Sequence, residues 1–287
     1  MIASANTTPQ PSHPTGNPSV ANWPTVTSTR AQRISGIARN AFREAVRDRI
    51  LYNLVLFVLL LIVASLFLGE LSDSQEAKII VDMGLSAMLI FGVFIAIFVG
   101  VGLVYKEIER RTVYAIFAKP VGRGELLLGK YLGLCLTLFV NVLVMGVGVS
   151  LALLLTRSGG KLAWRIWPAV ILIFLELTII TAVALLFSTF SSPALSALLT
   201  FFVFIIGHFS ADLKAFANAL GTIGAKVVFN GLFYALPNLA NYSYITPSAY
   251  GALPESGHFF GALLYAVFYN GLLLGLATLI FQRRNFK

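Results

Sequence analysis

The sequence has very little cysteine, histidine and charge, and each shortage excludes a class of protein. Its single cysteine, Cys135, lies inside an apolar run, which excludes an internal disulfide and a cysteine-based metal cluster. The three histidines, His13, His208 and His258, are too scattered to suggest a metal site. Charged residues make up only 11% of the 287 residues and hydrophobic residues 57%, with a mean hydropathy of +0.84. Water-soluble domains of this length do not have such a composition, so the sequence predicts an integral membrane protein.

The first 50 residues divide into two segments. Residues 1–29 are rich in Pro, Ser, Thr and Asn and carry no charged side chain, which predicts a disordered cytoplasmic tail and not a signal peptide. Residues 30–50 repeat Arg39, Arg43 and Arg47 every four residues and place an apolar stripe on another side. That pattern predicts an amphipathic interfacial helix, its arginines among anionic headgroups and its stripe facing the acyl chains; a solvated helix on a soluble domain is the alternative. The stripe consists of Ile34, Ile37, Ala38, Ala41, Phe42 and Ala45.

The rest of the chain, residues 51–287, contains six apolar segments that are long enough to cross a bilayer. They are residues 51–68, 79–104, 131–155, 167–189, 193–210 and 259–281. We therefore expect an all-α membrane domain of six transmembrane helices. Two longer stretches connect them: residues 105–130, which are densely charged, and residues 211–257.

The distribution of positive charge sets the orientation, because Lys and Arg accumulate on the cytoplasmic side. With a cytoplasmic N-terminus, 15 of the 21 Lys and Arg residues fall inside. We expect a multi-pass protein of the bacterial cytoplasmic (inner) membrane, with both termini cytoplasmic. The outer loop with Arg157, Lys161 and Arg165 runs against this rule.

The outer segment 211–257 is too apolar for a free loop and too interrupted by Pro237, Pro247 and Pro254 for another full crossing. Irregular backbone at membrane depth must be shielded by protein. The segment is therefore predicted to form short or re-entrant helices before the last crossing.

A phosphate-binding pattern occurs once, as Gly124-x4-Gly129-Lys130 within KPVGRGELLLGKY. A Walker A loop needs a glycine-rich turn after a strand and a Ser or Thr after the Lys to hold magnesium. Here leucines fill the turn and Tyr131 takes the magnesium position. We therefore expect that this chain is not an ATPase and holds no cofactor of its own.

The loop 105–130 as a whole resembles the first cytoplasmic loop of type-2 ABC exporter permeases. Members of that family carry a Glu before a Gly-Thr, then a Pro-Val/Ile-x-Arg turn, then an acidic residue and a Gly-Lys that opens the next helix. The matching residues here are Glu107, Thr112, Pro120, Val121, Arg123, Glu125, Gly129 and Lys130, whereas Arg111 replaces the usual Gly. The six-helix layout, the preceding amphipathic helix and the Arg283-Arg284-Asn285-Phe286 ending extend the resemblance over almost all of the chain after residue 30. Within the family it is most similar to the single-domain bacterial permeases grouped with the nitrous-oxide-reductase maturation permease.

The resemblance implies a membrane-spanning permease subunit of an exporter, driven by a separate ABC ATP-binding subunit that holds ATP and magnesium. That subunit would dock on the loop 105–130, which would act as a coupling loop; the alternative is that the loop charges only anchor it among headgroups. The expected coupling residues are Glu107, Arg110, Arg111, Arg123 and Glu125. The resemblance also implies a second permease subunit, as a homodimer or a related chain. The other expected partner is the lipid bilayer, and no nucleic acid is expected.

Two pairs of glycines have the four-residue spacing that lets helix backbones approach closely. They are Gly129 with Gly133 and Gly271 with Gly275. We expect them to serve helix packing, either within one subunit or between two.

Polar residues at membrane depth are the remaining candidates for function. Glu176 lies near the middle of the fourth apolar segment, where an ionised carboxylate costs roughly 2.5 to 3.5 kcal/mol, so it should face protein or a wet cavity. It is expected either to line the substrate path or to pin helices together. Asn141, Thr178 and Thr181 are further candidates for the path, although such residues more often form packing hydrogen bonds.

The class of transporter and the role of one aromatic stripe both have more than one interpretation. A stand-alone secondary transporter or channel using Glu176 is the alternative to the ABC permease, although no inverted repeat with matching broken helices is evident. The stripe of Phe91, Phe94 and Phe98 is more typical of a core or lipid-facing surface than of a substrate site. The substrate itself is not indicated.

Overall fold

A computed structural model describes residues 29–45, 56–57, 75–109, 122–156, 159–210 and 223–283. Within these ranges the chain is helical and contains no strand, as expected for an all-α membrane protein. Four helical stretches are long and apolar enough to cross a membrane: Glu76–Gly102, Gly124–Leu155, Leu162–Ser188 and Ser256–Gln282. The first predicted crossing, 51–68, lies outside the described residues except for positions 56 and 57. The predicted tail 1–29 lies outside them except for residue 29.

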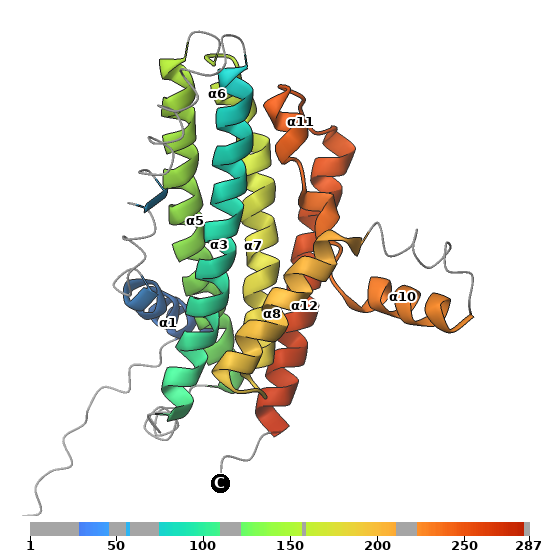
Figure 1. Cartoon of the computed structure of the whole chain (residues 1–287). Coiled ribbons are helices and arrows are strands. Elements are labelled where there is room, and N and C mark those ends of the chain that lie inside the picture. The colour runs from blue at the N-terminus through green and yellow to red at the C-terminus, as the bar shows by residue number, and fades with distance from the viewer. Residues whose placement is uncertain are drawn as a thin grey trace, which may run out of the picture.

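Five long helices form a bundle and run roughly side by side (Figure 1). They are α3 (Glu76–Glu109), α5 (Arg123–Leu155), α7 (Trp167–Ser188), α8 (Pro193–His208) and α12 (Ser256–Arg283). A single turn of helix, α6 (Leu162–Arg165), leads into α7. Pro168 begins the main part of α7 and Pro193 begins α8, at positions where a missing N–H costs no helical hydrogen bond.

The helices α3 and α5 are longer than the predicted crossings 79–104 and 131–155. With 34 and 33 residues, each extends about 50 Å, which exceeds the 30 Å of a typical hydrocarbon core. Hydropathy detects only the part of a helix that is apolar, so it missed the charged first turns of α5. Much of the predicted loop 105–130 is therefore helix.

The helix α8 is shorter than predicted. Its 16 residues rise only about 24 Å, which is less than the roughly 30 Å thickness of a hydrocarbon core. A complete fifth crossing over 193–210 is therefore not confirmed. Three short helices follow: α10 (Ile223–Ala235), η2 (Leu239–Tyr242) and α11 (Ile245–Ala249). The helix α10 projects sideways from the bundle, whereas η2 and α11 return along it (Figure 1). That they re-enter the membrane remains a prediction.

The helix α7 is the centre of the bundle and packs against α3, α5, α8 and α12. Most of its residues are buried, including polar ones, so it has no continuous lipid-facing side. Small residues let its neighbours approach: a Cβ at Gly100 of α3 would lie 3.3 Å from the Cβ of Ala184. Such close contacts drive helix association in lipid, where the hydrophobic effect between helices is weak.

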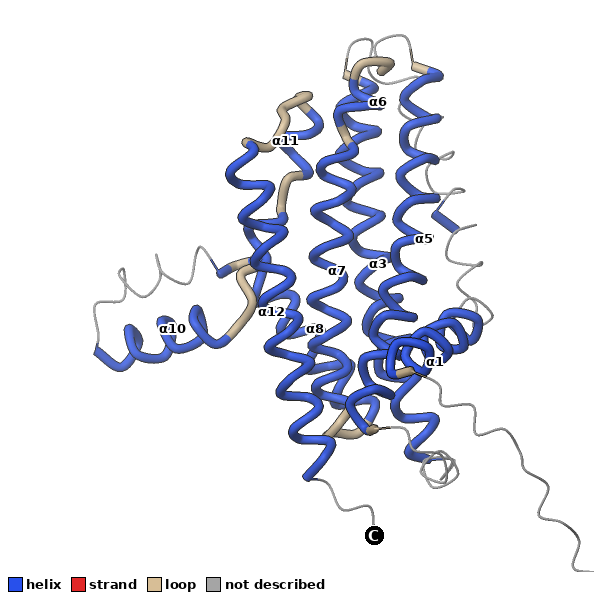
Figure 2. Tube along the Cα trace, turned by 180° about the vertical axis from the view of Figure 1, so that it is seen from behind, coloured by secondary structure: helices blue, strands red, loops and turns tan. Residues whose placement is uncertain are grey.

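The amphipathic helix α1 (Arg30–Ala45) lies across the bundle against α5 (Figure 2). Gly129 and Gly133 form the floor of this contact. A Cβ at Gly129 would lie 2.7 Å from the Ile37 side chain, and a Cβ at Gly133 would lie 2.5 Å from the backbone oxygen of Ala38. The apolar stripe of α1 was predicted to face the acyl chains, but Ile37 and Ala41 pack on α5 instead. The last five residues of the predicted segment 30–50 lie outside the described residues.

Two of the cations that the sequence predicts to lie outside, Arg165 and Lys78, take part in packing. The Nη1 of Arg165 donates a hydrogen bond to the carbonyl of Gly251 at 3.2 Å. The Nζ of Lys78 lies 4.6 Å from the centre of the Tyr250 ring, a cation–π contact that joins α3 to the segment after α11. Gly251 has a positive φ of 73°, which favours glycine at this turn.

The contact of α1 with α5 predicts that Gly133→Ala destabilises the protein. The added methyl meets backbone of α1 and not a flexible side chain, and overpacking of this kind costs about 1–3 kcal/mol. Gly271→Ala in α12 is the matched control, because nothing lies within 4 Å of a Cβ at that position. Thermal unfolding of the purified protein should occur at a lower temperature for Gly133→Ala and at an equal or slightly higher temperature for Gly271→Ala, because alanine favours the helix more than glycine does. Equal unfolding temperatures for the two variants would contradict this account of the contact.

Candidate functional site

The predicted coupling residues that the structure describes lie at the end of α3 and at the start of α5. Glu107 lies in the last turns of α3 and Arg123 is the first residue of α5, although their side chains are outside the described part of the structure. Arg110 and Arg111 lie outside the described residues. The side chain of Glu125 is therefore the one member of the predicted set whose contacts the structure describes.

Glu125 joins the first turn of α5 to the amphipathic helix α1. Its Oε2 accepts a hydrogen bond from Arg33 Nε at 3.0 Å, and its Oε1 accepts one from Arg33 Nη2 at 3.2 Å. The Nε of Arg30, an exposed side chain, lies 3.2 Å from Oε1. A paired contact of a guanidinium with a carboxylate fixes orientation as well as distance. The sequence suggested Glu125 for contact with an ATP-binding subunit, and it did not reveal Arg33 as a partner.

The four polar residues predicted for a substrate path are buried inside the bundle. Asn141 is 3% exposed, Thr178 6%, Thr181 0% and Glu176 1%. The Nδ2 of Asn141 donates to the Thr137 carbonyl at 2.9 Å. The hydroxyls of Thr178 and Thr181 donate to carbonyls one turn earlier in α7, at 2.6 and 2.8 Å. Their donors are thus used within their own helices.

Two further polar residues complete this interior group, and sequence reasoning missed both. Asn270 of α12 donates from Nδ2 to the Thr178 hydroxyl at 3.0 Å, which ties α12 to α7. His208, the last residue of α8, places Nδ1 at 3.4 Å from Glu176 Oε1. A signal for the second contact was available. Glu176 lies 12 residues before the end of α7 and His208 lies 15 residues after the start of α8, so a tight antiparallel turn brings them to similar depth.

The glycine pair in α12 behaves differently from the pair in α5. Gly271 and Gly275 are exposed, and nothing lies within 4 Å of a Cβ built at either position. They lie on a face of α12 where Val267, Leu272 and Leu276 are also exposed. Within the part of the chain that the structure describes, no helix covers this apolar surface.

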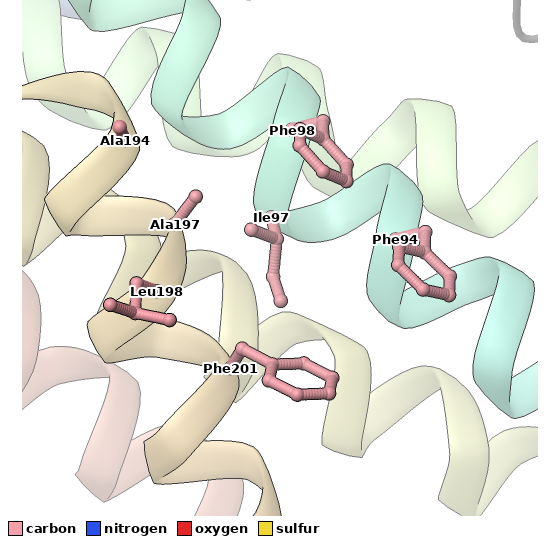
Figure 3. Close-up of a pocket in the computed structure, with 7 residues that line it drawn as sticks. All are labelled: Phe94, Ile97, Phe98, Ala194, Ala197, Leu198 and Phe201. Atoms are coloured by element: carbon pink, nitrogen blue, oxygen red, sulfur yellow. The ribbon is translucent and has the colours of Figure 1, made fainter.

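An apolar pocket of about 280 Å³ opens between α3 and α8. Figure 3 shows Phe94, Ile97 and Phe98 of α3 facing Ala194, Ala197, Leu198 and Phe201 of α8. The rings of Phe94 and Phe98 are stacked, with centroids 6.1 Å apart and planes 7° from parallel. Glu176, Asn141, Thr178 and Thr181 do not line this pocket. The aromatic stripe that the sequence associated with core or lipid thus forms one wall of a recess.

Comparison with known proteins places these features in a family. A probable ABC transporter permease protein, NosY of Stutzerimonas stutzeri, is 28% identical to this chain over 140 residues. The match covers 47% of this chain and half the length of that relative. A model of the ABC-2 family transporter protein matches residues 36–286, which include every helix of the bundle. The chain therefore belongs to the ABC-2 transporter family, whose members are multi-pass membrane proteins.

Proposed function

We propose that this chain is the permease subunit of an exporter in the bacterial inner membrane, and that a separate ATP-binding subunit drives it from the cytoplasm. The observation that carries the proposal is the match of the family to residues 36–286. The relative's printed name, a probable ABC transporter permease, supports the same role. ATP and magnesium would be held by the partner, and both termini of this chain would be cytoplasmic.

The geometry at the cytoplasmic end supports a mechanical role for the loop between α3 and α5. Residues 110–121 connect the end of one 34-residue helix to the start of a 33-residue helix, and these helices pack along each other. A subunit that pressed on the loop would displace both helices as rigid rods. Glu125 and Arg33 would carry the same displacement to α1, so the membrane surface helix would move with α5.

The pocket between α3 and α8 supports a transport path on this side of the bundle. Its wall consists of Phe, Ile, Leu and Ala side chains, and Phe98 is 63% exposed in the single chain. A second permease subunit facing it would enclose a largely apolar path. Such a path favours a substrate with a substantial apolar part, because a desolvated charge would find no partner among these residues.

Loss of charge in the coupling loop should weaken the contact between this subunit and the ATP-binding subunit. We expect Arg111→Ala to reduce the ATPase rate of the assembled complex by weakening contact with the ATP-binding subunit, since charge pairs at a rim orient partners. Lys161→Ala is the matched control, because Lys161 is an exposed cation beside α6 at the other end of the bundle. An ATPase rate unchanged by Arg111→Ala would support the alternative, in which the charged residues only anchor the loop among lipid headgroups.

Pairing through the α3 and α8 face can be tested with single cysteines. In a chain with Cys135→Ala, Phe98→Cys should give disulfide-linked dimers in membranes, because two copies of the pocket would face each other. Phe260→Cys in α12, which is 61% exposed, is the control that should remain monomeric. If the cysteine at 260 formed dimers and the one at 98 did not, the path would have to lie on another face.

A further inference from the structure

The carboxyl group of Glu176 and the imidazole of His208 form a buried pair, and the imidazole also interacts with the backbone of Phe204 one turn earlier in α8. Oε1 of Glu176 lies 3.4 Å from Nδ1 of His208. Among the residues that the structure describes, neither carboxyl oxygen nor Nδ1 meets a partner with hydrogen-bond geometry. The Glu176 side chain is 1% exposed and the His208 side chain 24% exposed. The pair is thus open to its surroundings only through the imidazole.

The pair lies at membrane depth. The helix α8 begins at the turn after α7 and rises about 24 Å before it ends at His208, which is less than the 30 Å hydrocarbon thickness. Glu176 is in the middle of α7, a helix packed against four others. Bulk water therefore cannot solvate a charge on the carboxyl group.

The other titratable groups around the pair, among the residues that the structure describes, are tyrosines and a thiol. Tyr242 of η2 interacts electrostatically with Glu176, and its hydroxyl donates to the Ala262 carbonyl at 2.8 Å. Tyr265 of α12 accepts a hydrogen bond from the Asn238 N–H at 3.0 Å. The remaining ones are Tyr269 of α12 and Tyr131 and Cys135 of α5, and α3 contributes Lys78 and Asp82 only near its outer end. The tyrosines and the thiol cannot carry a positive charge, and α5 also contains Lys130, which is buried in its first turns.

The charge of the pair then depends on how many protons it holds. Without an added proton, an ionised carboxylate faces a neutral imidazole and the pair carries one buried negative charge. With one proton, the pair is neutral as a whole, and a hydrogen bond can join Oε1 to Nδ1. An unpaired buried charge is expensive, whereas a neutral hydrogen-bonded pair is not.

We propose that Glu176 and His208 form a proton-binding site, which holds one proton between the carboxyl group and Nδ1 and so keeps the C-terminal end of α8 attached to α7. The proton comes from water and reaches the pair through the exposed edge of His208; no electron is transferred and no other bond changes. The ring of Phe204 lies against the imidazole with centroids 4.8 Å apart, which holds the imidazole beside the carboxyl group. The site does not depend on the proposed transport function.

Infrared spectroscopy of the purified full-length chain tests for the proton directly. The wild-type protein should show the carbonyl stretch of a protonated carboxylic acid at neutral pH, and Glu176→Gln should abolish it. His208→Phe should keep the stretch but shift it to the frequency of a carboxylic acid without a hydrogen bond, because the imidazole acceptor is gone. Absence of the stretch in the wild-type protein at neutral pH, or its persistence in Glu176→Gln, would overturn the proposal.

The dependence of the unfolding equilibrium on pH shows whether the site binds a proton or a metal cation. If the folded chain holds one proton that the unfolded chain releases, the unfolding equilibrium constant should rise about tenfold per pH unit above neutrality. Glu176→Gln should remove this dependence, since its amide can donate to Nδ1 without titrating, and Asp82→Asn, at an exposed carboxyl group, should leave it unchanged. Stability that varied with sodium or potassium at fixed pH, and not with pH, would assign the site to a metal cation and overturn the proposal.

Discussion

The close packing of α7 against its neighbours is the constraint on which the rest of the structure depends. Inside a bilayer, polar groups must find partners in the protein, and helices associate through contact and not through exclusion of water. The helix α7 meets both demands, with Ala184 against Gly100 of α3 and Thr178 hydrogen-bonded to Asn270 of α12. Because α7 is covered by protein on its sides, its polar residues form hydrogen bonds within the bundle. Surfaces that contact other molecules must therefore lie on the helices around it.

The surfaces that we propose for function lie where α3 ends and α5 begins and on the face shared by α3 and α8. At the first, Glu125 binds Arg33 and so connects α1 to the start of α5. At the second, Phe94, Phe98 and Phe201 line an apolar pocket. The helix α3 belongs to both, since it runs from the proposed coupling loop along the whole bundle and forms one wall of the pocket. A displacement at its cytoplasmic end would therefore reach the proposed path without any intermediate.

Composition and hydropathy predicted most of the helices, whereas contacts between helices were harder to predict. The segment 167–189 agrees closely with α7, because Trp167-Pro168 and the serine-rich turn mark its ends in the sequence. The full crossing predicted over 193–210 was not confirmed, since hydropathy does not show where a helix stops at membrane depth. The spacing of Gly129 and Gly133 indicated a close approach but not that α1 would be the partner. The sequence did not indicate the contact of His208 with Glu176, because it depends on the register of α7 and α8 and not on spacing along the chain.

We propose above all that this chain does not hydrolyse ATP and that it works with a separate ATP-binding subunit. The most direct measurement is reconstitution of the purified chain into liposomes with and without that subunit, followed by assay of subunit retention and ATP hydrolysis. The account predicts that the chain alone hydrolyses no ATP, that it retains the ATP-binding subunit on the liposomes, and that it changes the rate at which that subunit hydrolyses ATP. Hydrolysis by the chain alone, or an ATP-binding subunit that neither binds the liposomes nor changes its rate, would contradict the account.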